Sequence, residues 1–333
     1  MEDIAVIGAG SYGTCLAICF ARAGHRVTFY CRKPEVAAAM QSARETSYLP
    51  GHRLPDNVSV TADLEHAVRG RRFVVGVTPS HGIRDVLGTA AKWIDPDAIV
   101  INASKGLEEG SHATIDRVYA EVFPKWIAER ATYLSGPTFA GEIAAGMPAA
   151  IVLAGRDATT TADAQDALHS LHFRIYTTHD VIGVLVGGAL KNVIAIGAGI
   201  SDGLGFGSNT RIALITRGLS EITRMGVALG ADPLTFAGLS GMGDLVLTCS
   251  GDASRNRRVG LALGAGKTMT QILAEATQVA EGVKTAKVAH ELGKKLAVEV
   301  PIIDAMYSII HEGMPVRDAL TMLLSRRVGA ERE

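Results

Sequence analysis

Three glycines near the N-terminus, Gly8, Gly10 and Gly13, constrain the fold more than any other feature of the chain. They follow an apolar run at residues 4–7, typical of a short buried strand, and precede a helical run from Thr14 to Ala23. In that order the first glycine allows a tight turn, the second lets a pyrophosphate approach the backbone, and the third lets helix and strand pack closely. N–H groups at the start of a helix also attract anions. The pattern therefore predicts a dinucleotide-binding turn.

The rest of the chain divides into two textures. Further strand candidates, separated mostly by helix-like stretches, lie at residues 27–30, 73–77, 98–102, 131–135 and 149–153. This alternation predicts a mainly parallel sheet. Five later segments look helical, at residues 181–199, 209–230, 257–263, 283–296 and 302–312. We predict an α/β Rossmann-type dinucleotide-binding domain at residues 1–180 and an all-α substrate and catalytic domain at residues 181–333, which suits a chain of this length.

Composition excludes several functional classes. Lys and Arg number 33 against 34 Asp and Glu, so the chain has no basic field for nucleic acid or anionic lipid. The four cysteines, at positions 15, 19, 31 and 249, show no metal-type or redox spacing, which favours a reducing compartment. The acidic start at Met1 is unlike a signal peptide, so we expect a cytoplasmic protein. We expect no metal ion.

One apolar stretch, from Val181 to Ile200, raises the question of a membrane span. Lys191 and Asn192 lie at its middle, and a charge at the centre of a bilayer costs about 3 kcal/mol. We therefore predict a buried protein helix and no membrane span.

The residues after the second strand candidate bear on the choice of cofactor. At this position an acidic side chain would bind the ribose 2′-OH of NADH, whereas arginine would meet the 2′-phosphate of NADPH. The chain has Arg32 and Lys33 there, and no acid before Glu35. We predict that NADPH is favoured and NADH tolerated; the alternative is that both cations are solvated surface charges.

Lys191 is the most informative residue of the second half. Its neighbours at residues 187–195 are nearly all small or apolar, so its ammonium should be poorly hydrated and its pKa lowered toward neutrality. Such a lysine can protonate the oxygen of a ketone as hydride reaches the carbonyl carbon. The alternative is a lysine that extends to the surface or pairs with a buried acid. The residues alone thus indicate a reductase of a small anionic carbonyl compound, with its site between the sheet and the helical domain.

Taken together, the motifs resemble one family closely, the bacterial-type NAD(P)-dependent glycerol-3-phosphate dehydrogenases. The resemblance covers nearly the whole chain. It rests on GAGSYGT at 8–14, YLPG at 48–51, SKGLE at 104–108, SGPTFAGE at 135–142, GALKNVIAIGAGISDGLGFGSN at 188–209, NTRIALITRGLSE at 209–221, GLSGMGDLVLTCS at 238–250 and SRNRRVG at 254–260.

The resemblance implies roles for individual residues. Lys191 would be the proton donor and acceptor, Lys105 would contact cofactor and substrate, and Asp244 would lie near the substrate and help to set the charge of Lys191. Further substrate contacts would come from Gly136, Thr138, Ser254, Arg255 and Asn256, with Arg255 holding the phosphate. Cofactor contacts would come from Ser11, Tyr12, Lys105, Ala140, Arg255, Val279 and Glu281. Position 12 commonly carries tryptophan in this family; here it is Tyr12, and stacking on the cofactor should survive the change.

The resemblance also implies the substrate pair, dihydroxyacetone phosphate and sn-glycerol 3-phosphate, a role in phospholipid synthesis, and a homodimer. Two alternatives stay open at this stage. One is another two-domain hydroxyacid or ketoacid reductase, and the other is a dinucleotide sensor without catalysis. On charge alone, the SRNRR run would be an exposed basic loop, and residues 238–244 a plain connection between helices.

Overall fold

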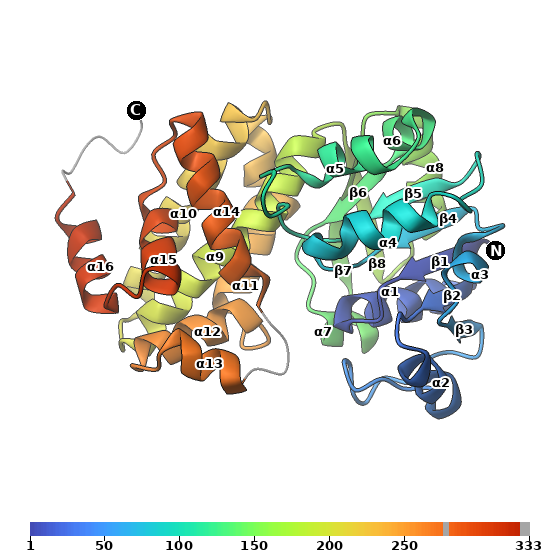
Figure 1. The fold of residues 1–333 in the computed structure, drawn as a ribbon, viewed down its shortest axis with the longest axis horizontal. Coiled ribbons are helices and arrows are strands. Elements are labelled where there is room, and N and C mark those ends of the chain that lie inside the picture. The colour runs from blue at the N-terminus through green and yellow to red at the C-terminus, as the bar shows by residue number, and fades with distance from the viewer. Residues whose placement is uncertain (276–279, 327–333) are drawn as a thin grey trace.

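The computed structural model describes residues 1–275 and 280–326, which form a sheet-containing half and a helical half side by side (Figure 1). The sheet has eight strands in the order β3-β2-β1-β4-β5-β6-β7-β8, and all neighbours are parallel except β6 and β7. The strands are β1 (Asp3–Ile7), β2 (Arg26–Tyr30), β3 (Val58–Thr61), β4 (Phe73–Gly76), β5 (Ile99–Asn102), β6 (Thr132–Ser135), β7 (Ala149–Gly155) and β8 (Phe173–Thr178). The predicted fold class is confirmed.

Two strands of this sheet are absent from the sequence-based prediction, and both lie at its edges. Along the first residues of β8 buried and exposed side chains alternate, and β3 has only four residues, of which Val58 alone is buried. An edge strand covered on one side lacks the continuous apolar run of a central parallel strand, so its pattern is weaker. The first helix also begins earlier than predicted, at Ser11, because its first turn belongs to the glycine loop itself.

Helices cover both faces of the sheet. One face carries α1 (Ser11–Arg22), α2 (Pro34–Ala43), α7 (Ala140–Ala144) and α8 (Ala158–Leu168); the other carries α3 (Leu64–Val68), α4 (Ile83–Ala90), α5 (Ile115–Val122) and α6 (Lys125–Arg130). Along β1, Ile4 and Val6 enter the first core and Ala5 and Ile7 the second, because successive strand side chains point to opposite faces.

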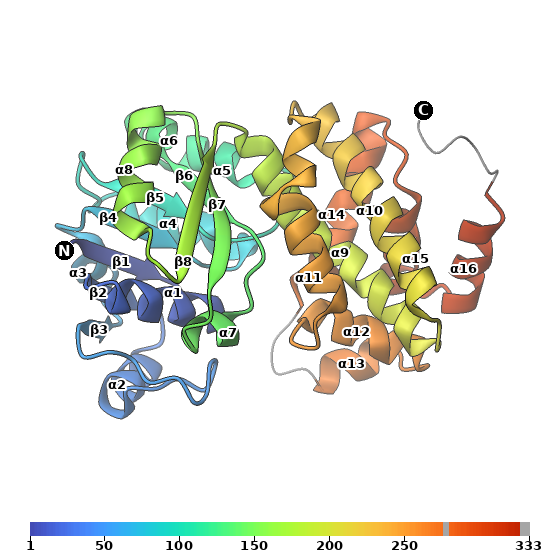
Figure 2. The ribbon, with the colours of Figure 1, turned by 180° about the vertical axis from the view of Figure 1, so that it is seen from behind.

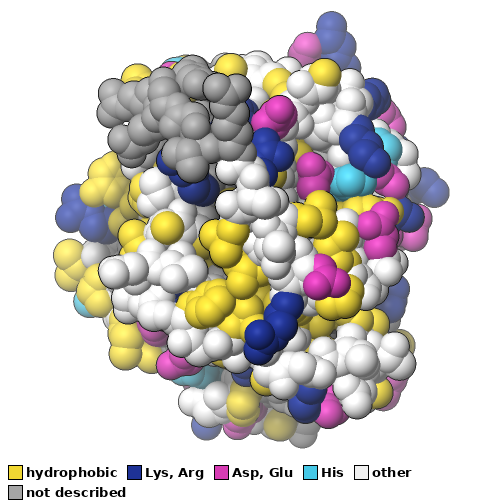
Figure 3. Space-filling view, turned by 90° about the vertical axis from the view of Figure 1, so that its left-hand side faces the viewer, with side chains coloured by type: hydrophobic (Ala, Val, Ile, Leu, Met, Phe, Trp, Pro, Cys, Tyr) yellow, Lys and Arg dark blue, Asp and Glu magenta, His cyan; other side chains and the backbone are white. Residues whose placement is uncertain are grey.

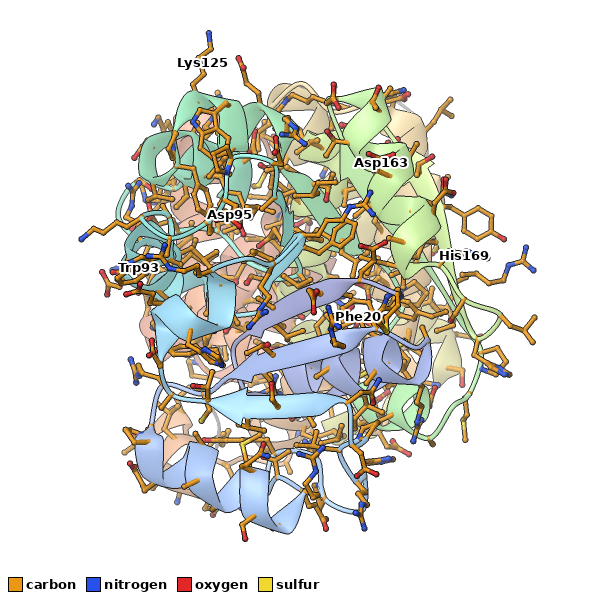
Figure 4. The ribbon with its side chains drawn as sticks, turned by 90° about the vertical axis from the view of Figure 1, so that its right-hand side faces the viewer. Phe20, Trp93, Asp95, Lys125, Asp163 and His169 are labelled. Carbon is orange, nitrogen blue, oxygen red and sulfur yellow. The ribbon has the colours of Figure 1, made fainter. Side chains whose placement is uncertain are left out.

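Figure 4 views this half from its outer end. Asp163 of α8 and His169 at its end lie on one side of the molecule, and Trp93 and Lys125 lie on the other. Phe20 of α1 lies in the core beneath the strands, where its ring meets the edge of a second phenylalanine ring with centroids 6.4 Å apart. The sheet is thus a rigid layer buried on both faces, as parallel sheets require.

The helical half is built around α9 (Val181–Gly203) (Figure 2). The helices that follow it are α10 (Ser208–Ala228), α11 (Asp244–Ser250), α12 (Arg255–Gly264), α13 (Met269–Glu275), α14 (Glu281–Leu296), α15 (Pro301–His311) and α16 (Val316–Leu324). Of these, α10, α11, α12, α14 and α15 pack against α9, while α16 lies farther out. Helix α9 is apolar and long enough to cross a membrane, but 94% of its most apolar window is buried inside the protein. The predicted buried helix is therefore confirmed, and the described residues after Thr178 contain no strand.

Glycines let α12 lie directly against α9. A Cβ at Gly199 would come within 2.0 Å of the Arg257 carbonyl oxygen, and a Cβ at Gly260 within 2.0 Å of the Ile196 carbonyl oxygen. Only hydrogen atoms fit between backbones this close, so any larger side chain would force the helices apart. These contacts hold α12 against the second half of α9, the helix whose middle carries Lys191.

Candidate active site

The glycine loop between β1 and α1 has the geometry of an anion cradle. Gly8 has φ of +125°, and a Cβ there would lie 2.7 Å from the Val77 carbonyl oxygen. A Cβ at Gly13 would lie 1.8 Å from the Gly8 carbonyl oxygen, so this glycine packs helix against turn. A Cβ at Gly10 would meet no described atom within 4 Å, which leaves open space before the first N–H groups of α1. The residues present therefore fit a dinucleotide pyrophosphate.

Residues predicted to choose the cofactor lie next to this loop. The Gly8 N–H donates to the Tyr30 carbonyl oxygen at 3.3 Å, so the end of β2 is adjacent to the glycine turn. Arg32 and Lys33 follow immediately and are both exposed. On the other side of the turn, the Ser11 hydroxyl donates to the Tyr48 carbonyl oxygen at 2.6 Å. The structure thus brings the YLPG segment and the two cations to the same edge of the sheet.

Three charged side chains from distant parts of the chain meet where the two halves join. Lys191 comes from the middle of α9, Asp244 from the first residue of α11, and Lys105 from the loop after β5. The Lys191 ammonium donates to one carboxylate oxygen of Asp244 in a short contact, and the Lys105 ammonium donates to the other at 2.8 Å. Asp244 is fully buried, and each of its two carboxylate oxygens accepts a hydrogen bond from one lysine.

Burial governs the protonation of Lys191, which is 6% exposed. Removal from water lowers the pKa of Lys191 to about 7, Asp244 opposes this shift, and the nearby positive charge of Lys105 adds to it. Lys191 does not extend to bulk water. It pairs with a buried acid, as one of the alternatives from the sequence foresaw, but the pKa of Lys191 stays lowered in spite of that partner. An amine with this pKa exchanges a proton readily at neutral pH.

The backbone before Asp244 packs unusually closely against its neighbours. Residues Leu239–Gly243 form a π-helical turn, a feature often found at functional sites. A Cβ at Gly241 would lie 2.2 Å from the Phe236 carbonyl oxygen, and a Cβ at Gly187 of α9 would lie 2.5 Å from the Ser240 carbonyl oxygen. Residues 238–244 connect two helical segments, and their glycines also bring the turn against α9, which places the Asp244 carboxylate at Lys191.

Lys105 is held by the sheet half as well. Its ammonium donates to the Gly136 carbonyl oxygen at 3.1 Å and to the Thr138 hydroxyl at 3.4 Å, and it lies 5.8 Å from the centre of the Tyr12 ring. Gly136 has φ of +138°, which is favourable only for glycine. Ala140, predicted to line the cofactor, begins α7 shortly after this segment.

The SRNRR run is the first turn of α12, so its interpretation as an exposed loop is wrong. Ser254 caps the helix by accepting the Arg257 N–H at 3.2 Å. Arg257 is buried and donates to Asp202 at 2.7 Å. Neither residue could be assigned to a cap or an ion pair from charge pattern alone, since the partners depend on how α12 meets α9.

The other predicted ligand residues cluster at the start of α14. Asn256 is buried, and its amide donates to the Asn192 side-chain oxygen at 2.9 Å while its own oxygen accepts the Gly282 N–H at 2.9 Å. Glu281 accepts from a serine hydroxyl of the sheet half at 3.5 Å; burial raises the pKa of Glu281, and the charge of Arg255 opposes the rise. Val279 lies outside the described residues.

Sequence reasoning missed two polar groups at this site. Asn192 ties α9 to α12, and its signal was visible, because it is a polar residue in the same apolar helix as Lys191. Ser135 is the last residue of β6, and its hydroxyl oxygen lies 2.7 Å from where a Cβ of Gly188 would be. The sheet therefore touches α9 one turn before Lys191. Ser135 begins the SGPTFAGE motif, but the motif alone does not show its contact with α9, because that contact depends on how β6 packs on α9.

Comparisons with known proteins agree with this architecture over the full chain. Residues 3–161 match the family described as the NAD-dependent glycerol-3-phosphate dehydrogenase N-terminus, and residues 180–321 match the corresponding C-terminus. A protein of Geobacter sp. (strain M21) named glycerol-3-phosphate dehydrogenase [NAD(P)+] is 50% identical over 331 residues, with 99% of both chains covered. A protein of the same name from Geobacter sulfurreducens is 49% identical over 332 residues, again with 99% of both chains covered.

Solved structures give the same result. The crystal structure of glycerol-3-phosphate dehydrogenase from Coxiella burnetii is 36% identical, with a TM-score of 0.92 over 98% of this chain and 99% of that one. A ketopantoate reductase from Ralstonia eutropha shares the fold alone, at 16% identity and a TM-score of 0.59, over 96% of this chain and the whole of that one. The resemblance that the motifs indicated is therefore confirmed, and the chain belongs to the NAD-dependent glycerol-3-phosphate dehydrogenase family.

Proposed function

We propose that this protein interconverts dihydroxyacetone phosphate and sn-glycerol 3-phosphate, with a nicotinamide dinucleotide as the redox partner. The observation that carries the proposal is the pairing of a buried lysine of lowered pKa with Asp244 at the junction of the two halves. Relatives about half identical over the whole chain are named for this activity with NAD(P)+.

The glycine loop and the start of α1 would hold the pyrophosphate, with Ser11, Tyr12, Ala140 and Glu281 at the edges of the site. When bound, a reduced nicotinamide supplies the hydride that converts the carbonyl carbon of the substrate to an alcohol carbon.

Lys191 performs the proton step. As hydride reaches the carbonyl carbon, negative charge develops on the oxygen, and protonated Lys191 gives it a proton to form the alcohol. In the reverse direction neutral Lys191 removes the hydroxyl proton. A pKa of about 7 populates both forms near neutral pH, so one residue serves both directions.

Lys105 and Asp244 prepare this step. Lys105 stabilises the developing oxyanion, and it is held for this purpose by Asp244 at 2.8 Å and by the Gly136 carbonyl oxygen at 3.1 Å. Asp244 compensates the charge of both lysines, which would otherwise repel each other in a site with little water. Thr138 contributes its hydroxyl beside Lys105.

The substrate phosphate binds at the start of α12. The helix N-terminus favours an anion, and the planar guanidinium of Arg255 suits two phosphate oxygens better than an ammonium would. Ser254 and Asn256 flank Arg255, and both are buried. Asn256 holds this turn to α9 and α14 through its two side-chain hydrogen bonds.

NADPH is the preferred cofactor in this proposal, with NADH accepted. Arg32 and Lys33 support the preference, because both are exposed beside the glycine turn and no acidic residue lies between the end of β2 and Glu35. The KM values for NADPH and NADH measure it directly, and a clear preference for NADH would contradict it.

The decisive experiment replaces Lys191 by alanine and follows absorbance at 340 nm with dihydroxyacetone phosphate. We expect kcat to fall by about two to four orders of magnitude, the usual contribution of a positioned acid, while the dinucleotide still binds. Lys287→Ala, an exposed lysine of α14, is the control and should retain full activity. Normal turnover in Lys191→Ala would refute the mechanism, and a higher kcat/KM with a branched 2-keto acid or a 3-hydroxy acid would favour another reductase.

Three further proposals accompany the activity. We assign residues 1–180 to cofactor binding and 181–333 to the substrate, because β8 ends at Thr178 and α9 begins at Val181. The product supplies glycerophospholipid synthesis in the cytoplasm.

The active form is a homodimer: the outer end of the helical half shows apolar side chains at its surface (Figure 3), and both Ile212 of α10 and Met322 of α16 are exposed. Light scattering during gel filtration tests the dimer, and a monomeric mass would refute it.

A further inference from the structure

The loop that carries Lys105 is attached to both halves of the protein. It runs from residue 103 to 114, between β5 and α5, and we name it the strap. Two residues after Lys105, Leu107 enters the hydrophobic core of the helical half and is 3% exposed. On the sheet side, Arg84 of α4 donates to both carboxylate oxygens of Glu108, at 2.5 and 2.9 Å. The strap therefore crosses the junction at the point where Lys105 reaches Asp244.

The far end of the strap is tied to α14. The His112 ring nitrogen Nε2 lies 2.7 Å from a carboxylate oxygen of Glu291, and the Lys284 ammonium lies 3.5 Å from the Glu109 carboxylate. Lys284 and Glu291 are seven residues apart, about two turns, and so lie on the same face of α14. One helix face thus holds the strap at two positions.

His112 adopts a backbone conformation that an ordinary residue avoids, with φ of +58°. The two other described non-glycine residues with positive φ, Arg44 and Ala297, both end helices, where this conformation is common. His112 instead lies at the end of a hydrogen-bonded turn, where its N–H donates to the Glu108 carbonyl oxygen at 3.1 Å. The turn sets this backbone conformation, and in it the His112 ring reaches Glu291 of α14.

The strap transmits the position of His112 to Lys105. The Glu108 N–H donates to the Ala113 carbonyl oxygen at 3.0 Å, and the His112 N–H donates to the Glu108 carbonyl oxygen at 3.1 Å. These bonds close residues 108–113 into one compact turn. When the end of this turn is fixed on α14, its beginning at Leu107 is fixed as well, and Lys105 is only two residues earlier.

We propose that His112 and Glu291 are positioning residues for Lys105, which act by fastening the strap to the helical half so that the Lys105 ammonium stays on Asp244. The proposal rests on the role proposed above for Lys105. Both side chains are partly exposed, at 22% and 37%, and neither meets Lys105 directly, so their effect is on placement and not on the chemistry.

The test uses two single variants and their combination in the full-length protein. His112→Asn retains a residue that tolerates positive φ but has a shorter side chain, and Glu291→Ala removes the carboxylate from a helix position. We expect each to lower kcat with dihydroxyacetone phosphate about fivefold, the effect of losing one hydrogen bond, with the KM for NADPH unchanged. The double variant should lose no more than either single one, because both remove the same contact. Lys287→Ala, on the same helix, is the matched control.

A second background separates positioning from general stability. Lys105→Arg should itself lose at least about tenfold in kcat/KM, since a guanidinium does not replace an ammonium at a fitted site. Adding His112→Asn to Lys105→Arg should then cause little further loss. The same fivefold loss in both backgrounds, or unchanged kcat in both single variants, would overturn the positioning role while the role of Lys105 stands. Wild-type activity in Lys105→Arg would instead refute the function proposed for Lys105.

Discussion

Replacing Asp244 by asparagine tests the electrostatic design of the site most directly. The change keeps the size of the side chain and removes one negative charge that is fully buried between two ammonium groups. Asp244 is the main influence that supports the protonated form of Lys191 against burial. Its loss must therefore lower the pKa of Lys191 further.

The magnitude follows from the geometry. An opposite charge in direct contact commonly moves a pKa by about 1 to 3, so Asp244→Asn should bring the pKa of Lys191 from about 7 to about 5. At pH 7 the protonated fraction of Lys191 then falls from about one half to about one hundredth, and ketone reduction slows about 50-fold from protonation alone.

The assay is the pH profile of kcat in each direction. Reduction needs protonated Lys191, so its rate falls as pH rises through the pKa; oxidation needs neutral Lys191, so its rate rises through the same value. We expect midpoints near pH 7 in the wild type, and both midpoints at lower pH in Asp244→Asn.

The control is Asp252→Asn, because the Asp252 side chain is fully exposed and its ion pair is with Arg257, not with either lysine. Its profiles should match the wild type. Midpoints that stay in place in Asp244→Asn, or that move to higher pH, would refute the assignment of Lys191 as the titrating proton donor.

Three other predictions concern stability and cofactor choice. Gly260→Ala puts a Cβ 2.0 Å from the Ile196 carbonyl oxygen and should lower the free energy of unfolding, measured in urea, by about 3 kcal/mol. The control Gly88→Ala on α4 makes only ordinary contacts and should raise it by about 0.5 to 1 kcal/mol. Equal effects of the two changes would disprove the close helix contact. Glu221 is 2% exposed and accepts two backbone N–H bonds at the start of α15. Burial raises the pKa of Glu221 from 4.5 to about 7. Its contribution to the free energy of unfolding is therefore complete below pH 4.5 and is lost as pH rises to about 7, a loss of about 3 kcal/mol. This pH-dependent loss should be absent from Glu221→Gln when unfolding is measured across that range. Arg32→Ala should raise the KM for NADPH about tenfold and leave that for NADH unchanged, and a similar rise for both would show that Arg32 does not contact the 2′-phosphate.

Local pattern accounts for much of what could be predicted. The glycine turn, the central parallel strands and the long helices of the second half follow from residue spacing, because the period of burial is a property of each element by itself. The burial of Lys191 belongs to the same class, since its apolar neighbours are adjacent in the chain. The weakly patterned elements, such as edge strand β8 and the first turn of α12, escaped because their partners lie elsewhere in the sequence.

The sequence by itself determined that the chain has a dinucleotide turn, a parallel sheet, a helical half and a buried lysine, and the family resemblance added which other residues to expect nearby. Only the tertiary structure decided how they meet. Asp244 is 53 residues from Lys191 and 139 from Lys105, and Glu291 is 179 from His112. Contacts over such separations depend on where glycines let backbones touch and on how α9 packs against the sheet, which no local period records.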